Sequence, residues 1–528
     1  MMTKNNQVLQ HTKLLLIFLL LILSQLISAQ NEQGTGYPYF VNFTQGLQPQ
    51  EAYKVTTSGV QNDATFTTDG LRLTRNINNI SGGVILADRI FKSNQGIKFE
   101  FEYAIYGGGS NGGDGISIFL IDGSIPKQQL NLGYFGGGLG YTFIRGSQSM
   151  EGLRGAYLGI GLDEFGNFKT TFNQSDRRRN GIFGTTLADF RNNVTLRAKR
   201  GNQDLPNSES AGYNGYPLLY TTATNASPSS NNRSVYLDVQ TGNYVGAQRT
   251  DLTQFTVENG GNSIPQNDTD VRFRKAYVTL VPNPTGGYNI TLEIQHGNVK
   301  EKVIDNYYYP PTLKYTENVY PIFNYFTWSW TYNNKQVRTL DTSPPATFRI
   351  GFAASTGDAK NIHLLKNLGV TRPYSAEVTD DLFAGCPNIK STYSPLLNDV
   401  AYTSLNGQNP PVASYDNIDF NSFRFLDLNG AVIPNIVGGV YTNSEGTWTY
   451  YPSTGRLSFK PANGFTGVAK IMYDIKGGGR NGTESPYNDE SYRSMPALVQ
   501  VNISNSNNCS KSCVVSNKNV TQKIYTNP

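Results

Sequence analysis

Short segments in which apolar and polar residues alternate run along most of the chain. Between them lie clusters of Gly, Pro, Asn and Thr. Alternation with a period of two is typical of half-buried β-strands, and the clusters are typical of turns. Almost no segment repeats its apolar residues at helical spacing, so the pattern predicts an all-β sandwich or barrel. Clear examples of such segments are 97–103, 116–121, 194–198, 276–281 and 288–294.

The run 14–23 is apolar throughout, and Lys4 and Lys13 precede it. Ile27-Ser-Ala29 then offers a small residue at the cleavage position, so we expect residues 1–29 to be a secretory signal peptide. An uncleaved anchor is the alternative. No later run approaches about 20 apolar residues, the length that spans a bilayer. We therefore expect a secreted or cell-surface protein that has no transmembrane segment after cleavage.

The formal net charge of the 528 residues is +5, and removal of Lys4 and Lys13 with the signal peptide would lower it to +3. A charge so close to zero over this length argues against a nucleic-acid partner. The compact basic run is Arg177-Arg-Arg179, within the polar stretch 173–181. A solvated loop explains this run better than a phosphate site does.

A chain of this length predicts two or three domains. The composition changes after residue 373, and we expect a linker at 374–397 and a second β domain at 398–504. A polar, irregular insertion occupies about 201–267, and polar surface insertions often carry recognition. The polar tail 505–528 is expected to be loose.

Four aromatic side chains have two interpretations. Tyr213 and Tyr216, in the insertion, could stack on the apolar face of a sugar or pack within an ordinary loop. Trp328 and Trp330 share one face of a predicted strand, where packing in the core or on the sheet is expected rather than a binding platform.

The cysteines are Cys386, Cys509 and Cys513. In an exported chain two of them can form a disulfide and one would remain. The sequence does not choose the pair.

The strand predicted at 157–162 ends in Asp163-Glu-Phe165-Gly166-Asn167. A carboxylate, a backbone carbonyl and an amide oxygen fall at every second position there. Such oxygens suit a hard cation such as Ca²⁺, and Gly166 lets the turn curl around it. A hairpin turn rich in Asp, Gly and Asn is the alternative interpretation.

The run 158–167 resembles the metal-binding strand of the legume-type (L-type) lectins. Three further motifs stand in that family's order. Gly113-Asp114-Gly-Ile-Ser-Ile-Phe-Leu120 resembles its sugar-gripping aspartate strand, and Phe135-Gly-Gly-Gly-Leu-Gly140 its glycine-rich sugar loop. Gly351-Phe-Ala-Ala-Ser-Thr-Gly357 resembles the strand and loop near the end of that domain. The resemblance spans about 36–373, the expected lectin-like domain, and implies a concanavalin A-like jelly-roll sandwich. It is closer to the bacterial lectin-like relatives than to plant lectins.

The resemblance also implies residue roles. Asp163, the carbonyl of Phe165 and Asn167 would hold calcium, with Asp176 as the nearest candidate for a further ligand. Asp114 would grip the sugar, and the peptide bond before it is expected to be cis. The other sugar contacts implied are Gly137, Gly138, Asn167, Ser355 and Thr356.

The chain departs from the family's pattern at the second metal. A transition-metal ligand, a glutamate two positions before the bridging aspartate, is Gly161 here, and the second bridging aspartate is replaced by Phe172. No histidine follows in the loop. We therefore expect calcium without a second, transition-metal ion.

The second β region is centred on a predicted hairpin, with one strand ending at Tyr451, a turn at 452–455 and a strand to Phe459. Its phrases Gly446-Thr-Trp448 and Gly464-Phe465-Thr-Gly467 resemble the repeats of CshA-type fibrillar surface adhesins. The resemblance implies a spacer or adhesive module rather than a catalyst, as a second, smaller β-sandwich.

The residues do not predict an enzyme. A retaining sandwich glycosidase needs two carboxyl groups about 5 Å apart. Asp163 and Glu164 are adjacent, so on a strand they would point to opposite faces. Beyond the signal peptide the histidines are His296 and His363, without a Gly-x-Ser-x-Gly elbow. His363 is expected to be a structural hydrogen-bonding residue.

Three functions therefore remain in view. The first is a calcium-supported carbohydrate-binding protein that captures glycans or polysaccharide, or serves cell-surface adhesion. The second is a structural or protein-adhesive surface component whose lectin fold has lost its sugar site, which the carboxylate missing at Gly161 supports. The third is a sandwich-fold glycoside hydrolase.

Overall fold

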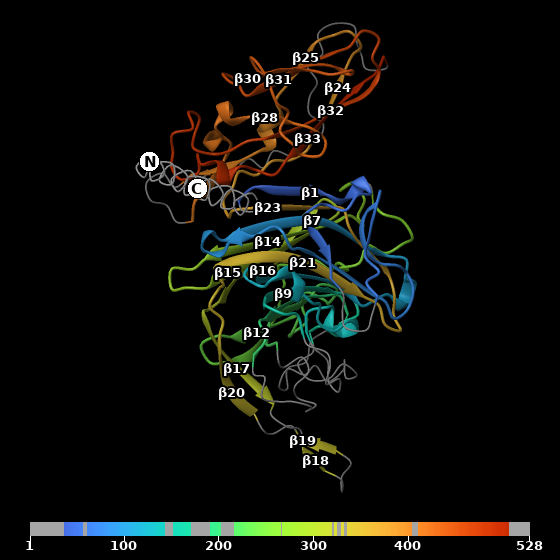
Figure 1. Cartoon of the computed structure of the whole chain (residues 1–528), viewed down its shortest axis with the longest axis vertical. Helices are drawn as coiled ribbons and strands as arrows, with labels where there is room; N and C mark the ends of the chain where they lie inside the picture. Colours follow the sequence, from blue (N-terminus) through green and yellow to red (C-terminus); the bar gives the residue numbers. More distant parts are fainter. Residues whose placement is uncertain are drawn as a thin grey trace, which may run out of the picture.

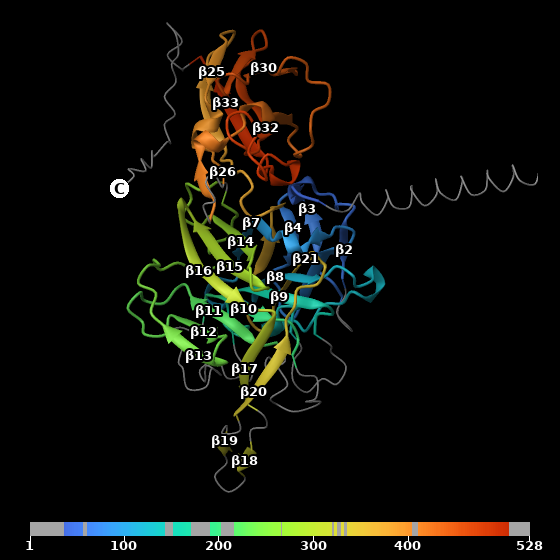
Figure 2. The same ribbon diagram turned by 90° about the vertical axis from the view of Figure 1, so that its left-hand side faces the viewer.

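The computed structural model is built of two β-rich bodies that follow one another along the long axis (Figure 1). A view at right angles shows the larger body, blue to yellow, with a long hairpin directed away from the smaller orange and red body (Figure 2). The residues described are 36–55, 61–142, 152–169, 191–201, 216–265, 267–318, 322–324, 329–331, 335–403 and 410–505.

Some expected features lie outside the described residues. They are the signal peptide 1–29, the run Arg177–Arg179, Asp176, Tyr213, Trp328, the side chain of Trp330, Cys509, Cys513 and the tail after residue 505.

The first sheet of the larger body has the strand order β16-β15-β14-β7-β22-β4-β3, and β23 joins β7 to β1. Along β7, Phe99 and Phe101 are buried while Lys98 and Glu100 are partly exposed. This is the alternation predicted for 97–103. The strands are β1 (Tyr39–Asn42), β3 (Thr65–Thr67), β4 (Gly70–Thr74), β7 (Ile97–Tyr106), β14 (Arg274–Pro282), β15 (Tyr288–His296), β16 (Val299–Tyr309), β22 (Ile362–Leu365) and β23 (Asn367–Thr371).

The second sheet has the order β13-β12-β11-β10-β9-β8-β21-β5-β2, and β6 pairs with β21. Its central strands β8 and β9 are buried at nearly every position, unlike the half-buried strands predicted. The reason is a smaller core, containing Leu132 and Tyr141, that covers the outer face. The strands are β2 (Ala52–Lys54), β5 (Ser81–Leu86), β6 (Phe91–Lys92), β8 (Gly115–Asp122), β9 (Ala156–Asp163), β10 (Asn193–Ala198), β11 (Leu218–Ala223), β12 (Ser234–Asp238), β13 (Asn243–Ala247) and β21 (Thr347–Ser355).

The two sheets pack face to face around one hydrophobic core. Phe101 of the first sheet meets Phe352 of the second edge to face, with ring centroids 5.9 Å apart. Contacts of this kind bury both inner faces, as in aligned sandwiches. The predicted all-β sandwich is therefore confirmed.

The smaller body is a second sandwich with its own core. Its sheets have the orders β24-β33-β32-β28 and β25-β31-β30-β29, and Trp448 is fully buried against Phe459 between them. The predicted hairpin is β30 and β31. The strands are β24 (Asp381–Gly385), β25 (Ser391–Tyr393), β28 (Arg424–Leu426), β29 (Val440–Thr442), β30 (Gly446–Tyr451), β31 (Arg456–Pro461), β32 (Gly467–Asp474) and β33 (Ala497–Ile503).

Two segments are more regular than expected. The polar insertion 201–267 contributes β11, β12 and β13 to the second sheet, and the segment 374–397, expected to be a linker, contributes β24 and β25. β11, β12 and β13 continue the sheet from β10 as consecutive antiparallel neighbours, whereas β24 and β25 pair with strands far along the chain. β24, for example, pairs in parallel with β33.

The remaining elements are short. Two-stranded ladders are formed by β17 (Thr312–Asn318) with β20 (Lys335–Asp341), β18 (Ile322–Asn324) with β19 (Ser329–Thr331), and β26 (Ala401–Thr403) with β27 (Val412–Ser414). Within the described residues no helix is long and apolar enough to cross a bilayer. The 3₁₀ turns are η1 (Phe43–Gln45), η2 (Ser93–Gln95), η3 (Gly109–Asn111), η4 (Lys127–Gln129), η5 (Gly136–Gly138), η9 (Pro395–Asn398), η11 (Tyr415–Asn417), η12 (Phe420–Ser422) and η13 (Glu490–Tyr492).

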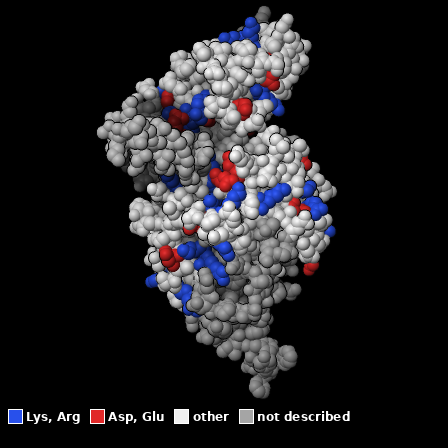
Figure 3. Space-filling model, in the orientation of Figure 1, with Lys and Arg blue, Asp and Glu red and all other residues white. Residues whose placement is uncertain are grey.

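Polar contacts join the two sandwiches. Lys98, on the outer face of the first sheet, forms an ion pair with Glu377. Arg372 donates to the hydroxyl of Ser491 over 2.8 Å and lies 4.0 Å from the ring centre of Tyr492. On the face shown in Figure 3 basic and acidic side chains are interspersed.

Cys386 is buried and disulfide-bonded. Cys386 is therefore one member of the disulfide, and its partner lies outside the described residues.

The core of the second sandwich contains two aspartates that share one tyrosine. The hydroxyl of Tyr473 lies 2.7 Å from Oδ2 of Asp399 and 3.4 Å from Oδ2 of Asp381. Burial, reinforced by the charge of Asp399, raises the pKa of Asp381 to about 9. Burial also raises the pKa of Asp399.

This arrangement predicts a stability that depends on pH. Because the folded pKa of Asp381 lies above its unfolded value of about 4, stability is greatest below about pH 4 and falls as the pH rises toward 9. Asp381→Asn should therefore stabilise the second sandwich near pH 8 by more than about 1.4 kcal/mol, the value of one pKa unit, and leave it almost unchanged near pH 4. Denaturant unfolding at both pH values measures the difference. Equal effects at the two pH values would contradict a protonated Asp381.

Candidate functional site

The candidate site forms where three neighbouring strands of the second sheet end. Gly115, the first residue of β8, pairs with Asp163 at the end of β9 and with Ser355 at the end of β21. Antiparallel pairing therefore brings the loops before β8, after β9 and after β21 to one end of the sheet. The backbone N–H of Phe165 donates to the carbonyl of Asp114 over 3.0 Å. The structure thus joins the predicted sugar residue to the predicted metal turn.

Asp114 is held by its backbone. The Gly113–Asp114 peptide bond is cis, as the resemblance implied. The N–H of Asp114 donates to the carbonyl of Ser355 over 2.9 Å. The side chain is 4% exposed, and a methyl group at Gly357 would lie 3.7 Å from its Oδ2 atom. The carboxylate of Asp114 therefore faces the loop that follows β21.

The glycine-rich loop joins the same cluster through Ser355. The hydroxyl of Ser355 donates to the carbonyl of Gly136 over 2.9 Å, and Gly137 and Gly138 continue that turn as buried residues. The hydroxyl of Thr356 donates to the carbonyl of Ile77 over 2.7 Å. Both hydroxyl side chains are at most 1% exposed, so they position loops, and their direct contact with a sugar stays a prediction.

An aromatic pair in this loop was missed by the sequence analysis. Tyr134 and Phe135 stack with centroids 4.8 Å apart and an interplanar angle of 10°, and both are half-buried. They precede the three glycines directly. Two adjacent aromatic residues beside a glycine run were the available signal, and the family motif began one residue too late to include Tyr134.

In the predicted metal turn, Asp163 is already oriented. Its Oδ1 accepts the N–H of Gly166 over 2.8 Å, and its Oδ2 accepts the N–H of Lys169 over 3.2 Å. Burial raises the pKa of Asp163 to about 6, although the charge of Lys169 acts to lower it. Lys169 is itself buried.

The ligand atoms that the described residues offer are oxygens, the kind of atom that calcium binds. Asp163, the carbonyl of Phe165 and Asn167 are hard oxygen donors on one turn, and hydrogen bonds that orient a ligating carboxylate are common around metals. Calcium takes six to eight such oxygens, so about half would have to come from water and from residues such as Asp176. The ammonium of Lys169 balances part of the charge of Asp163 without a metal.

Glu164 is a further functional residue that the sequence analysis did not identify. Its side chain is fully buried, and its carboxylate accepts hydrogen bonds from Asn361 over 2.5 Å and from Arg191 over 3.4 Å. Arg191 also donates to the carbonyl of Gly112 over 2.8 Å. Burial, followed by the nearby carboxyl of Glu258, raises the pKa of Glu164 well above its usual range. Glu164 therefore supports the loop that carries Asp114.

The buried Glu164 also bears on hydrolysis. Two carboxyl groups that meet can serve a glycosidase only if the substrate reaches them. Glu164 is closed off from solvent, so a substrate does not reach its carboxylate in this structure.

His363 has the structural role that was predicted. Its Nδ1 atom lies 2.6 Å from the hydroxyl of Thr74, and burial lowers its pKa to about 3. A neutral, buried imidazole of this kind is poorly suited to act as a base. Tyr216 is also buried, with its ring 5.2 Å from that of Tyr141, which is the packing alternative for that residue.

No family model matches the sequence, and no curated protein matches it. Among solved structures the chain is similar to the metal-free VIP36 exoplasmic/lumenal domain, at 11% identity and a TM-score of 0.33, over 64% of this chain and 93% of that chain. The Ca²⁺/Man-bound form of that domain matches at 12% identity and a TM-score of 0.31, over 61% of this chain and 83% of that chain. Peanut lectin with a 9mer peptide matches at 13% identity and a TM-score of 0.29, over 63% of this chain and 97% of that chain. Scores this low carry no argument about function, and the sandwich is defined here by its own sheet order.

The close approach of Gly112 to Glu164 allows a direct test of whether Glu164 supports the loop that carries Asp114. A methyl group at Gly112 would lie 1.9 Å from Oε1 of Glu164, whereas one at Gly357 would meet nothing closer than 3.7 Å. Gly112→Ala should therefore lower the unfolding free energy by roughly 1–3 kcal/mol, as overpacking does. Gly357→Ala should leave it within about 0.5 kcal/mol. Thermal and denaturant unfolding of the two variants measure this, and equal stabilities would contradict the role given to Glu164.

Proposed function

We propose that the chain is an exported carbohydrate-binding protein of the L-type lectin kind, whose sugar site is centred on Asp114. The observation that supports it best is the cluster at the start of β8. There a carboxylate, a glycine-rich loop and the 163–167 turn are linked by hydrogen bonds through Ser355 and Phe165. No single one of these motifs would be specific, and their meeting at one end of the sheet favours a common ligand.

In this proposal each group has a defined task. The carboxylate of Asp114 accepts hydrogen bonds from two sugar hydroxyls, and the backbone N–H groups of Gly137 and Gly138 donate to sugar oxygens. The amide of Asn167 donates from the neighbouring turn. The rings of Tyr134 and Phe135 offer a surface for the C–H face of a pyranose. Because buried contacts hold these loops before the sugar arrives, little ordering cost accompanies binding.

Calcium belongs to the same proposal. Asp163, the carbonyl of Phe165, Asn167 and Asp176 would hold the ion, and its chemistry would be to fix the turn electrostatically. The sugar contacts themselves remain with Asp114 and the glycine loop.

The domain assignment is proposed with it. Residues 36–373 would form the lectin-like domain and 398–504 a CshA-type adhesin-like domain, so that the chain captures glycans at a cell surface or after secretion. The competing function is a structural or protein-adhesive surface component that binds no sugar. A glycoside hydrolase finds less support, because Glu164 is closed off from solvent.

Asp114→Ala should abolish glycan binding while the protein still folds. Loss of the carboxylate removes two hydrogen bonds to the sugar, and hydrogen bonds to a charged group contribute about 1.5–3 kcal/mol each. A glycan array measures binding, and far-ultraviolet circular dichroism with thermal unfolding checks the fold.

Gly357→Ala is the matched variant for this test. Its methyl group would cover the carboxylate of Asp114 without a clash, so it should weaken glycan binding by at least about tenfold at unchanged stability. Full binding by Asp114→Ala would exclude the proposed site. Absence of binding by the unaltered protein to every glycan would favour the structural alternative.

Calcium should raise the midpoint of thermal unfolding relative to chelator, because an ion that binds only the folded state stabilises it. Asp163→Ala should abolish the shift, and Lys169→Met should enlarge it by removing the competing ammonium. Thermal shift measurements with calcium and with chelator test all three proteins. An equal shift in Asp163→Ala would place calcium elsewhere.

A further inference from the structure

A cavity of about 470 Å³ lies at the opposite end of the strands that carry the candidate site. Asp122, which ends β8, and Ala156, which begins β9, both line it, whereas Asp114 and Asp163 lie at the other ends of these strands. Seven residues of extended strand separate the two ends by about 23 Å. The cavity is thus a separate feature, and its size is that of a small-ligand site.

Most of the charged side chains that line the cavity are basic. Arg154, Lys199 and Arg200 line the cavity together with one acidic residue, Asp122. Asp122 is engaged locally, since its Oδ1 accepts the N–H of Ser124 over 2.8 Å. Lys199 forms no ion pair with any described residue. A group of cations around a concave space attracts an anion.

One acidic neighbour lies outside the lining. The charge of Lys199 contributes to lowering the pKa of Asp341, after the hydrogen bonds that Asp341 accepts from Ser343. The carboxylate of Asp341 is exposed and holds the turn at Ser343. Among the described residues, three cations and two carboxylates thus lie at or beside the cavity, and both carboxylates already accept local hydrogen bonds.

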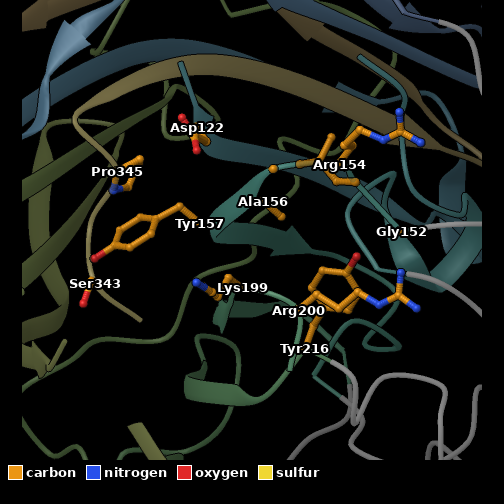
Figure 4. A pocket seen from close by; sticks show the side chains of 12 residues that line it. Asp122, Gly152, Arg154, Ala156, Tyr157, Lys199, Arg200, Tyr216, Ser343 and Pro345 are labelled. Atoms are coloured by element: carbon orange, nitrogen blue, oxygen red, sulfur yellow. The ribbon is translucent and has the colours of Figure 1, made fainter. Parts of the chain in front are cut away.

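Hydroxyl groups complete the lining. Figure 4 shows Tyr157 and Ser343 on one side of the space and Tyr216 and Arg200 on the other, with Lys199 between them. The hydroxyl of Tyr157 is buried and has no hydrogen-bond partner among the described residues. Buried hydroxyls almost always have a partner, so this one favours a polar occupant, either a ligand group or a water that accompanies it.

We propose that this cavity is a second binding site, for an acidic saccharide unit that carries a carboxylate or sulfate. The guanidinium and ammonium groups bind the anionic group, and the hydroxyls of Tyr157 and Ser343 bind sugar hydroxyls. A planar guanidinium suits either anion because it donates two parallel hydrogen bonds. The proposal does not rest on the Asp114 site, which lies at the far end of the sheet.

Isothermal titration of the full chain with two acidic probes tests the proposal. Digalacturonate carries carboxylates, a heparin-derived disaccharide carries sulfates, and galactobiose is the uncharged counterpart of the first. At least one acidic probe should bind, with an affinity that falls at high salt, and galactobiose should bind this cavity at least about tenfold more weakly. The stronger acidic probe identifies which anion the cavity takes.

Variants locate the binding. Lys199→Ala should lower the affinity for the acidic probe by at least about tenfold, and Lys199→Arg, which keeps the charge, should retain that affinity. Tyr157→Phe should lower the affinity for the acidic probe by about threefold to tenfold, the effect of one hydrogen bond. Lys54→Ala, at an exposed lysine of β2, is the matched control and should change nothing.

Asp114→Ala separates this proposal from the first site. It should leave acidic-probe binding unchanged even if it abolishes other glycan binding. The inference is overturned if neither acidic probe binds, if Lys199→Ala binds as well as the unaltered protein, or if binding is lost in Asp114→Ala. Equal affinity for galactobiose at a Lys199-dependent site would also overturn the anionic class.

Discussion

The arrangement of this protein depends on one row of paired residues across the second sheet. Gly115 lies between Ser355 and Asp163, and each belongs to a strand that changes into a loop at that point. Gly115 has a φ of +146°, and a methyl group there would lie 2.3 Å from the carbonyl oxygen of Leu162. Only glycine fits this conformation and this space. The close pairing of β8 with β9 therefore fixes how near the loop of Asp114 lies to the 163–167 turn.

The polar groups beneath this row are mostly buried, and their burial defines their role. Glu164, Asn361 and the hydroxyls of Ser355 and Thr356 all satisfy hydrogen bonds inside the protein. A buried polar group that is paired holds its loop firmly, because breaking the pair would leave a donor or acceptor without water. The same burial removes Glu164 from contact with substrate.

The contacts described between the two sandwiches do not involve β8. Contacts between the two bodies run through Lys98 of β7, Arg372 just after β23, and the segment that follows. These contacts involve residues of the first sheet or directly after it. β8 lies in the second sheet and carries the Asp114 loop at one end and the cationic cavity at the other. A single strand thus positions two chemically different features.

Local pattern was sufficient for β7, β14 and β15 of the first sheet and for the hairpin of β30 and β31, because alternation and turn residues act over a few positions. The order of the four lectin-like motifs also led to the cis bond before Asp114. Pattern did not predict β24 and β25, whose pairing partners lie far along the chain. It predicted β8 and β9 as strands but not the burial of their outer faces, which a second core covers.

By itself, then, the sequence determined the all-β class, the strand that ends at Asp163 and the residue types offered to a cation or a sugar. Only the tertiary structure decided that Glu164 lies beneath the site, that Tyr134 stacks on Phe135, and that Arg154 and Lys199 meet around one cavity. Each of these depends on contacts between segments distant in the chain. Such contacts leave no periodic trace in the sequence, because they are set by how sheets pair and pack.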